Sequence, residues 1–153
     1  MPLLSDKDRQ FLENFLKERL VDAVTLKFFT QAISCQFCKE TEQLLNEVAA
    51  LSDKIHLETY NFTLDKDAVQ ELGIRRIPAI AILGEKDYGI RFYGIPSGYE
   101  FNTLIEDIVA VSTKNHGLSE EKLPKVAQIQ KPVHIQVFVT PTCPYCPTAV
   151  RMA

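Results

Sequence analysis

The sequence lacks the features that mark membrane, secreted and nucleic-acid-binding proteins. No run of about 18 apolar residues is present to span a bilayer. The first ten residues, MPLLSDKDRQ, do not contain the apolar core of a signal peptide. The formal net charge is -3, whereas a nucleic-acid-binding domain normally carries a basic excess. We therefore expect no membrane and no nucleic-acid partner, and we take the cytoplasm as the default compartment.

The chain is also not rich in glycine or proline, with six and eight of its 153 residues. Hydrophobic residues make up 46% and charged residues 24%, which is close to the average for globular proteins and excludes disordered and collagen-like classes. This length allows one medium domain, or one small domain with an appendage.

The four cysteines form two C-x-x-C pairs, Cys35 with Cys38 in CQFC and Cys143 with Cys146 in CPYC. Structural disulfides are unexpected in a reducing cytosol, whereas a C-x-x-C beside a βαβ pattern indicates a redox dithiol. The surrounding sequence has to show whether that pattern is present.

The spacing of apolar residues predicts alternating helices and strands. It favours helices at 6–20, 35–51, 64–72 and 99–111. It favours strands, in chain order, at 24–29, 55–62, 79–83 and 89–94. A helical crossover makes the first two strands parallel neighbours, and a short link makes the last two a hairpin. The expected fold class is α/β, a mixed four-stranded sheet flanked by helices.

The order of elements in the first half of the chain is repeated near the C-terminus. VHIQVFVTPTCPYC, like VTLKFFTQAISCQFC, is an alternating strand followed by a polar loop, a C-x-x-C and a helix start. We expect a complete unit at 1–113, a linker at 114–131 with a short helix at 119–123, and an incomplete second unit at 132–153. The first copy takes about 90 residues from its strand onward and the second has 21. The alternative is that 133–139 is a fifth strand of the first unit.

Four motifs make the chain resemble the thioredoxin superfamily, and more closely the tandem glutaredoxin-like protein disulfide oxidoreductases of thermophilic archaea and bacteria. They are SCQFC at 34–38, RRIPAI at 75–80, YGIPSGYEF at 93–101 and VTPTCPYCP at 139–147. The resemblance implies a thioredoxin-like fold and two fused units, each with a C-x-x-C, the second continuing beyond the residues present.

The chain departs from ordinary thioredoxins in three respects. No tryptophan precedes either cysteine pair, and Phe29 stands where thioredoxins place a buried acid. Residues 94–98, GIPSG, replace the Gly-Gly and Asp pair of glutaredoxins. Neither a proton relay through a buried acid nor glutathione binding is therefore carried over from the resemblance.

Disulfide exchange needs a thiolate nucleophile and a nearby second thiol that resolves the mixed disulfide. We predict that Cys35 is the N-cap of a helix, where unpaired N–H groups stabilise its thiolate, and that Cys38 resolves. In the second pair, Cys143 takes the nucleophile's place and Cys146 the resolving one.

Two prolines bear on the second helix start. We expect Pro144 at the first helical position, where its missing N–H is no loss. We expect Pro147 near the fourth position, where it loosens the turn.

Further residues are expected to hold the substrate. The resemblance implies that Pro78 follows a cis bond and packs beside Cys35, leaving the Ile77 backbone free to pair with an extended substrate segment. The alternative is an ordinary strand-entry proline. Phe37 and Tyr145, each between two cysteines, are expected to form an exposed apolar lip.

Two arginines, Arg75 and Arg76, precede this proline. They are candidates to contact an acidic substrate or a glutathione carboxylate, and the alternative is that they are simply solvated.

The leading hypothesis is a protein disulfide oxidoreductase that reduces, oxidises or isomerises disulfides in protein substrates. It needs no metal and no organic cofactor, because the electrons reside in the cysteines, and a thioredoxin-reductase-like protein is a candidate electron donor. One alternative is a glutathione-coupled glutaredoxin. Others are a redox-inactive peptide-binding module with inert dithiols and a zinc-binding module, although 104 residues lie between the pairs, against roughly 15–20 in zinc ribbons.

Overall fold

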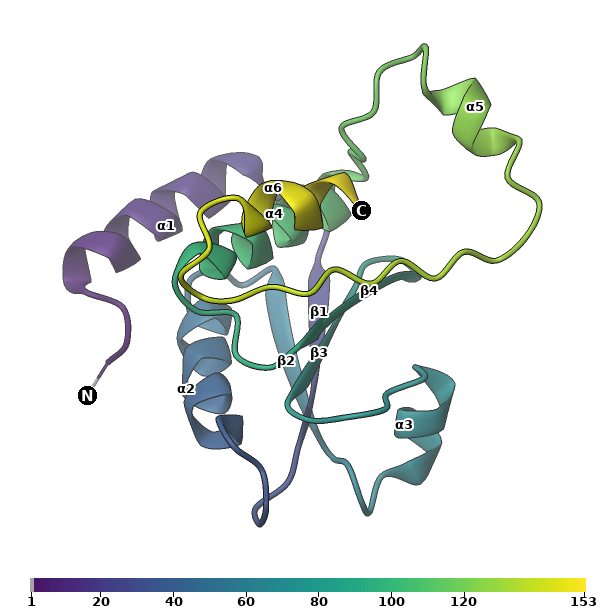
Figure 1. Cartoon of the computed structure of the whole chain (residues 1–153). Coiled ribbons are helices and arrows are strands. Elements are labelled where there is room, and N and C mark those ends of the chain that lie inside the picture. The colour runs from purple at the N-terminus through teal and green to yellow at the C-terminus, as the bar shows by residue number, and fades with distance from the viewer. Residues whose placement is uncertain (1) are drawn as a thin grey trace.

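The structure, a computed structural model, describes residues 2–153. Helices and strands alternate as far as β3, the strand β4 follows β3 directly, and the helix α4 and two short helices come after it (Figure 1). In chain order the elements are α1 Asp6–Arg19, β1 Val24–Thr30, α2 Cys38–Ala49, β2 Ile55–Asn61, α3 Lys66–Glu71, β3 Ala79–Leu83, β4 Asp87–Tyr93, α4 Tyr99–Thr113, α5 Leu123–Ala127 and α6 Cys146–Met152.

The four strands form one mixed sheet in the order β2-β1-β3-β4. β1 runs parallel to β2 and antiparallel to β3, and β3 forms the expected hairpin with β4. The register pairs Phe29 with Ala79, and Ala79 with Tyr93. The loop after β1 and the segment before β3 therefore lie at the same end of the sheet. The expected α/β fold is confirmed.

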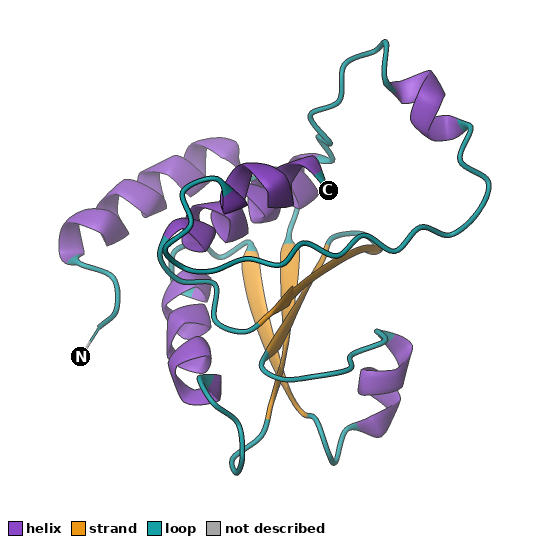
Figure 2. Ribbon diagram, in the orientation of Figure 1, coloured by secondary structure: helices purple, strands orange, loops and turns teal. Residues whose placement is uncertain are grey.

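Helices cover both faces of the sheet (Figure 2), because alternate side chains of each strand point to opposite faces. Leu26, Phe28 and Ile80 lie in a large core that also contains apolar residues of α1, α2 and α4. Phe29 and Ala79 face the other way, into a smaller core completed by residues around α3.

The linker differs in detail from the prediction. The short helix is α5, Leu123–Ala127, with Pro124 in its first turn, rather than a helix at 119–123. Proline is well placed there, because the first N–H groups of a helix have no partner within it. Figure 1 shows α5 on a loop that projects from the rest of the chain. No helix in residues 2–153 is long and apolar enough to cross a membrane.

Residues 133–139 form no strand, contrary to the prediction. Their sequence alternates as a strand does, but a strand requires hydrogen bonds to a neighbouring strand, and within the described chain residues 133–139 pair with none. Four of the seven are large apolar residues with exposed side chains, namely Val133, Ile135, Phe138 and Val139.

The C-terminal helix α6 packs against α4 (Figure 1). Arg151 of α6 pairs with Glu106 of α4 at 3.0 Å. Glu100 and Thr103 of α4 are buried, and an oxygen of each lacks a hydrogen-bond partner within the described chain. Together with Asp107, one turn further on, they form a polar stripe on α4.

Burial raises the pKa of Asp107 to about 6, helped by Glu106 and opposed by Arg151. A carboxyl whose pKa is higher folded than unfolded destabilises the fold when it ionises, so stability should fall as pH rises from about 4 to about 6. We expect Asp107→Asn to stabilise the protein at pH 7 by about 1–3 kcal/mol and to change little at pH 4. Urea unfolding at both pH values measures this.

The matched control is Asp53→Asn, which replaces an exposed loop carboxylate. An equal effect of the two substitutions at pH 7 would contradict the prediction.

Candidate active site

The first cysteine pair lies where the chain passes from β1 into α2. Cys35 and Cys38 are joined as a disulfide, with their Cα atoms 5.6 Å apart. Cys38 is buried at 4% exposure, whereas Cys35 is only partly buried. The more accessible sulfur thus belongs to the residue predicted as nucleophile, and the shielded one to the residue predicted to resolve.

The prediction that Cys35 is the N-cap of the helix is wrong. α2 begins at Cys38, and its N-cap is Phe37, whose φ of 65° lies in the left-handed region. A residue in that region interrupts the run of helical dihedrals, so the helix cannot extend back to Cys35. Cys35 instead lies in the loop just before the helix start, towards which the free N–H groups of the first turn point.

A surface groove of about 550 Å³ opens beside this disulfide. Cys35 and Cys38 line it together with polar residues from β1, α2, β2 and the turn after β2, including Thr30, Glu42, Thr59 and Asp65. The Asp65 carboxylate accepts a hydrogen bond from the Asn61 N–H at 2.6 Å, which orders the turn. The groove offers hydrogen-bonding groups next to both sulfurs.

The Ile77–Pro78 peptide bond is cis, as the resemblance implied. Pro78 is buried, and its carbonyl accepts a hydrogen bond from the Gly94 N–H at 2.9 Å. Within residues 2–153, the Ile77 backbone makes no hydrogen bond to another backbone group. Phe37, which is predicted to contribute to an apolar lip, is 47% exposed.

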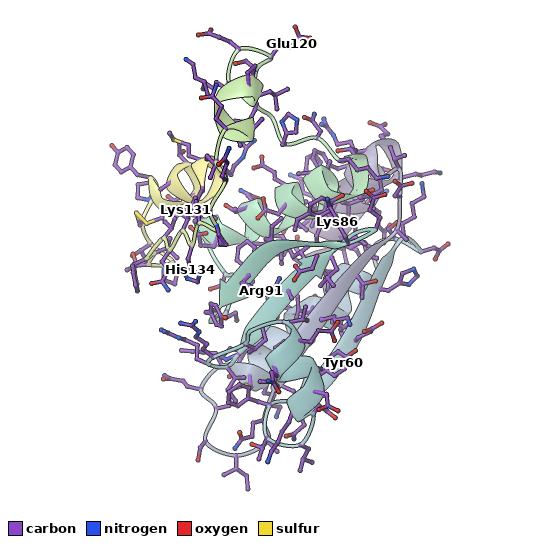
Figure 3. The ribbon with its side chains drawn as sticks, turned by 90° about the vertical axis from the view of Figure 1, so that its right-hand side faces the viewer. Tyr60, Lys86, Arg91, Glu120, Lys131 and His134 are labelled. Atoms are coloured by element: carbon purple, nitrogen blue, oxygen red, sulfur yellow. A yellow bond between two sulfur atoms is a disulfide. The ribbon has the colours of Figure 1, made fainter. Side chains whose placement is uncertain are left out.

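Phe29 occupies the position at which thioredoxins have a buried acid. Its side chain is fully buried and stacks on Tyr60 with the ring centroids 5.2 Å apart (Figure 3 labels Tyr60). Because this position is apolar, the carboxylates that line the groove with both cysteines are Glu42 of α2, one turn beyond Cys38, and Asp65 in the turn after β2.

The second pair begins α6. Cys143 and Cys146 are also joined as a disulfide, with their Cα atoms 5.4 Å apart, and Tyr145 is 83% exposed. The prediction for the prolines is corrected, because α6 begins at Cys146. Pro144 therefore precedes the helix, and Pro147 occupies its second position, where a missing N–H costs nothing.

The segment that carries the second pair passes very close to Gly98, just before α4. Gly98 has a φ of +62°, and a Cβ added there would lie 2.7 Å from the Pro141 carbonyl oxygen. We expect Gly98→Ala to loosen residues 140–153, seen as faster amide hydrogen exchange in that segment, in addition to a backbone cost of about 1–2 kcal/mol.

Gly94→Ala is the matched control. Gly94 also has a positive φ, +87°, but no atom lies within 4 Å of an added Cβ. Unchanged exchange in residues 140–153 of the Gly98 variant, or the same increase in both variants, would show that the close approach does not hold the segment.

The sequence alone did not identify the polar residues that line the groove beside Cys35 and Cys38, or the polar stripe on α4. The groove residues come from separate elements, and no spacing along the chain links them. Glu42 was detectable in part, because it follows Cys38 by four residues on one helix. The stripe of Glu100, Thr103 and Asp107 on α4 has the three-and-four spacing of a helix face, which was a usable signal.

The described residues contain no group of three or more His, Cys, Asp or Glu side chains arranged to hold a metal ion. The structure brings Cys35 to Cys38 and Cys143 to Cys146, each as a separate disulfide.

No protein-family model matches the sequence. Among curated proteins, the alkyl hydroperoxide reductase AhpF of Staphylococcus epidermidis is 32% identical over 114 residues, which cover 73% of this chain and 20% of that protein. Its Staphylococcus aureus counterpart is 27% identical over 143 residues, 89% of this chain and 26% of that protein. The chain thus spans about a fifth to a quarter of the length of these relatives.

Solved structures match nearly the whole chain. A protein disulfide oxidoreductase from Aeropyrum pernix superposes with a TM-score of 0.88 at 29% identity, covering 97% of this chain and 65% of that one. A domain of the alkyl hydroperoxide reductase AhpF from Enterococcus faecalis gives 0.83 at 29% identity, covering 97% and 71%.

Proposed function

We propose that this chain, which belongs to the thioredoxin-like disulfide oxidoreductases, transfers electron pairs between its own cysteine pairs and disulfides or dithiols of other proteins. The observation that carries the proposal is the position of the Cys35–Cys38 disulfide, at the junction of β1 and α2 beside an open groove. The similar proteins from Aeropyrum pernix and Enterococcus faecalis support it.

In the reducing direction the cycle begins with the dithiol form. The Cys35 thiolate attacks one sulfur of the substrate disulfide, so that a Cys35–substrate disulfide forms and one substrate thiolate leaves. The Cys38 thiolate then attacks the Cys35 sulfur, forming the Cys35–Cys38 disulfide and releasing the second substrate thiolate. Two electrons pass from the cysteine pair to the substrate, and the reverse sequence oxidises a substrate dithiol.

Residues at the same end of the sheet are proposed to hold the substrate. The Ile77 backbone is free to pair with an extended segment, next to the buried Pro78. Phe37 contributes an exposed apolar surface beside Cys35, and Tyr145 does so beside Cys143. Main-chain pairing suits protein substrates of loose sequence preference.

The same chemistry defines the rest of the proposal. The cycle needs no metal or organic cofactor, since the cysteines carry the electrons. A thioredoxin-reductase-like protein or reductase domain is the proposed electron donor, and the cytoplasm, where thiols are kept reduced, is the proposed compartment. Residues 1–113 form the working unit, 114–131 a linker, and 132–153 the beginning of a second unit.

Reduction of insulin by dithiothreitol tests the proposal. The wild-type chain should accelerate the reaction, and a variant that combines Cys35→Ser with Cys143→Ser should not. Equal rates for the two proteins would refute thiol–disulfide exchange as the function.

A further inference from the structure

Two exposed arginines, Arg75 and Arg76, lie immediately before the segment proposed to pair with substrate. Within residues 2–153 neither forms a salt bridge, whereas Arg91 pairs with Asp87 and Arg151 with Glu106. The Arg76 guanidinium lies 5.7 Å from the ring centroid of Tyr93. Two cations without a carboxylate are available to an outside partner.

The register of the sheet puts these arginines at the end where the cysteines lie. β3 starts opposite Phe29, six residues before Cys35, and opposite Tyr93 at the end of β4. The residues just before β3 and the loop just after β1 therefore share one end of the sheet. Arg76 lies over Tyr93 at that end.

Apolar surface accompanies the two charges. Ile33 and Phe37, on either side of Cys35, are 75% and 47% exposed, and Tyr93 is 43% exposed. The groove on the β2 side of the cysteine pair is mixed in charge, because Glu42 and Asp65 line it together with Lys39. The exposed charges just before β3 are thus both basic, whereas the groove carries charges of both signs.

We infer that Arg75 and Arg76 select protein substrates in which an extended segment carries an acidic residue beside its reactive cysteine. This inference rests on the proposed function and names its substrate class. The segment pairs with the Ile77 backbone, its apolar residues contact Ile33 and Phe37, and its carboxylate meets the arginines. Arginine suits this role because its planar fork of N–H donors matches a carboxylate.

The test uses two disulfide-linked fluorogenic peptides that differ at one position. One peptide carries glutamate two residues from the cysteine, and the other carries lysine at the same position. The pair is made twice, once with this residue before the cysteine and once with it after the cysteine. Dithiothreitol supplies the electrons, and the readout is the ratio of the two reduction rates divided by the same ratio for dithiothreitol alone. A general loss of activity lowers both rates and leaves this ratio unchanged, and the division removes the intrinsic difference in reactivity between the peptides.

We expect the wild-type chain to reduce the glutamate peptide about 3- to 10-fold faster than the lysine peptide in at least one placement. Combined Arg75→Glu and Arg76→Glu substitution should reverse the ratio, and the combined glutamine substitutions should bring it close to one. Raising the salt from 0.05 to 0.5 M should weaken the wild-type preference, because these charges are exposed.

Lys86→Glu is the matched control. Lys86 is a cation over a tyrosine ring, 5.2 Å from the Tyr88 centroid, but it lies at the other end of the sheet, where β3 turns into β4 (Figure 3). Its substitution changes the net charge by the same amount per residue and should leave the peptide ratio unchanged.

Three results with the peptides would overturn the inference while leaving the proposed function standing. They are an equal rate on both peptides, a preference that survives in the double arginine variants, and a preference that Lys86→Glu removes equally well. Glutathione-coupled turnover that needs the arginines, with no peptide preference, would overturn it in favour of a glutathione site. No reduction of any peptide by the wild-type chain would instead refute the proposed function.

Discussion

Replacement of Cys35 by serine is expected to lower insulin reduction to the rate measured without protein, whereas Cys143→Ser should retain most of the activity. A serine hydroxyl is not ionised at neutral pH and cannot form a disulfide, so it can neither attack the substrate disulfide nor form the mixed disulfide with the substrate. The asymmetry follows from the surroundings. Cys35 lines a groove at the end of the sheet where the Ile77 backbone has no backbone partner within the described chain, whereas no strand accompanies the Cys143 pair.

Cys38→Ser provides the informative companion. It leaves the nucleophile in place but removes the thiol that releases the substrate, so a covalent Cys35–substrate adduct should accumulate. Intact mass spectrometry before and after reduction measures the adduct. If Cys143→Ser abolishes turnover while Cys35→Ser spares it, the assignment of the working pair is wrong.

Replacement of Phe28 by alanine is expected to destabilise the protein by about 3–5 kcal/mol. Phe28 is fully buried on β1, in the core between the sheet and the helices α1, α2 and α4. Its strand neighbours, Thr59 on β2 and Ile80 on β3, fix its position, so the structure cannot collapse into the space left. The loss is a large part of the roughly 5–15 kcal/mol typical of a whole domain. Urea unfolding monitored by circular dichroism measures it.

Phe138→Ala is the control for this substitution. Phe138 is 83% exposed, so its removal should change the free energy of unfolding by about 0.5 kcal/mol or less. A comparable loss in the two variants would show that the described core is not where the stability resides.

Local patterns in the sequence were enough to locate most of the fold. The alternating VTLKFF and the buried AIAIL became β1 and β3, and the segments predicted as helices became α1 to α4 within a few residues. Crossover and hairpin rules then determined which strands are neighbours, because they depend on connection length alone. The cysteine spacing likewise identified the two pairs that the structure joins as disulfides, and the motif around Pro78 indicated its cis peptide bond.

Contacts between distant residues decided the rest. The left-handed conformation of Phe37 moved the start of α2 to Cys38, and no residue-type preference predicts such a φ for phenylalanine. Residues 133–139 have the alternation of a strand, yet they form none, because a strand exists only with a hydrogen-bonded neighbour.

The sequence by itself determined the order of the elements from α1 to α4 and the two cysteine pairs, because periodicity and spacing are properties of neighbouring residues. Only the tertiary structure decided which groups surround the sulfurs. It placed Thr59 and Asp65 in the groove with Cys38, set α6 against α4 with Arg151 paired to Glu106, and left Arg75 and Arg76 without carboxylate partners within the described chain. Those outcomes depend on how separate elements pack, and packing energies arise between residues that no local pattern connects.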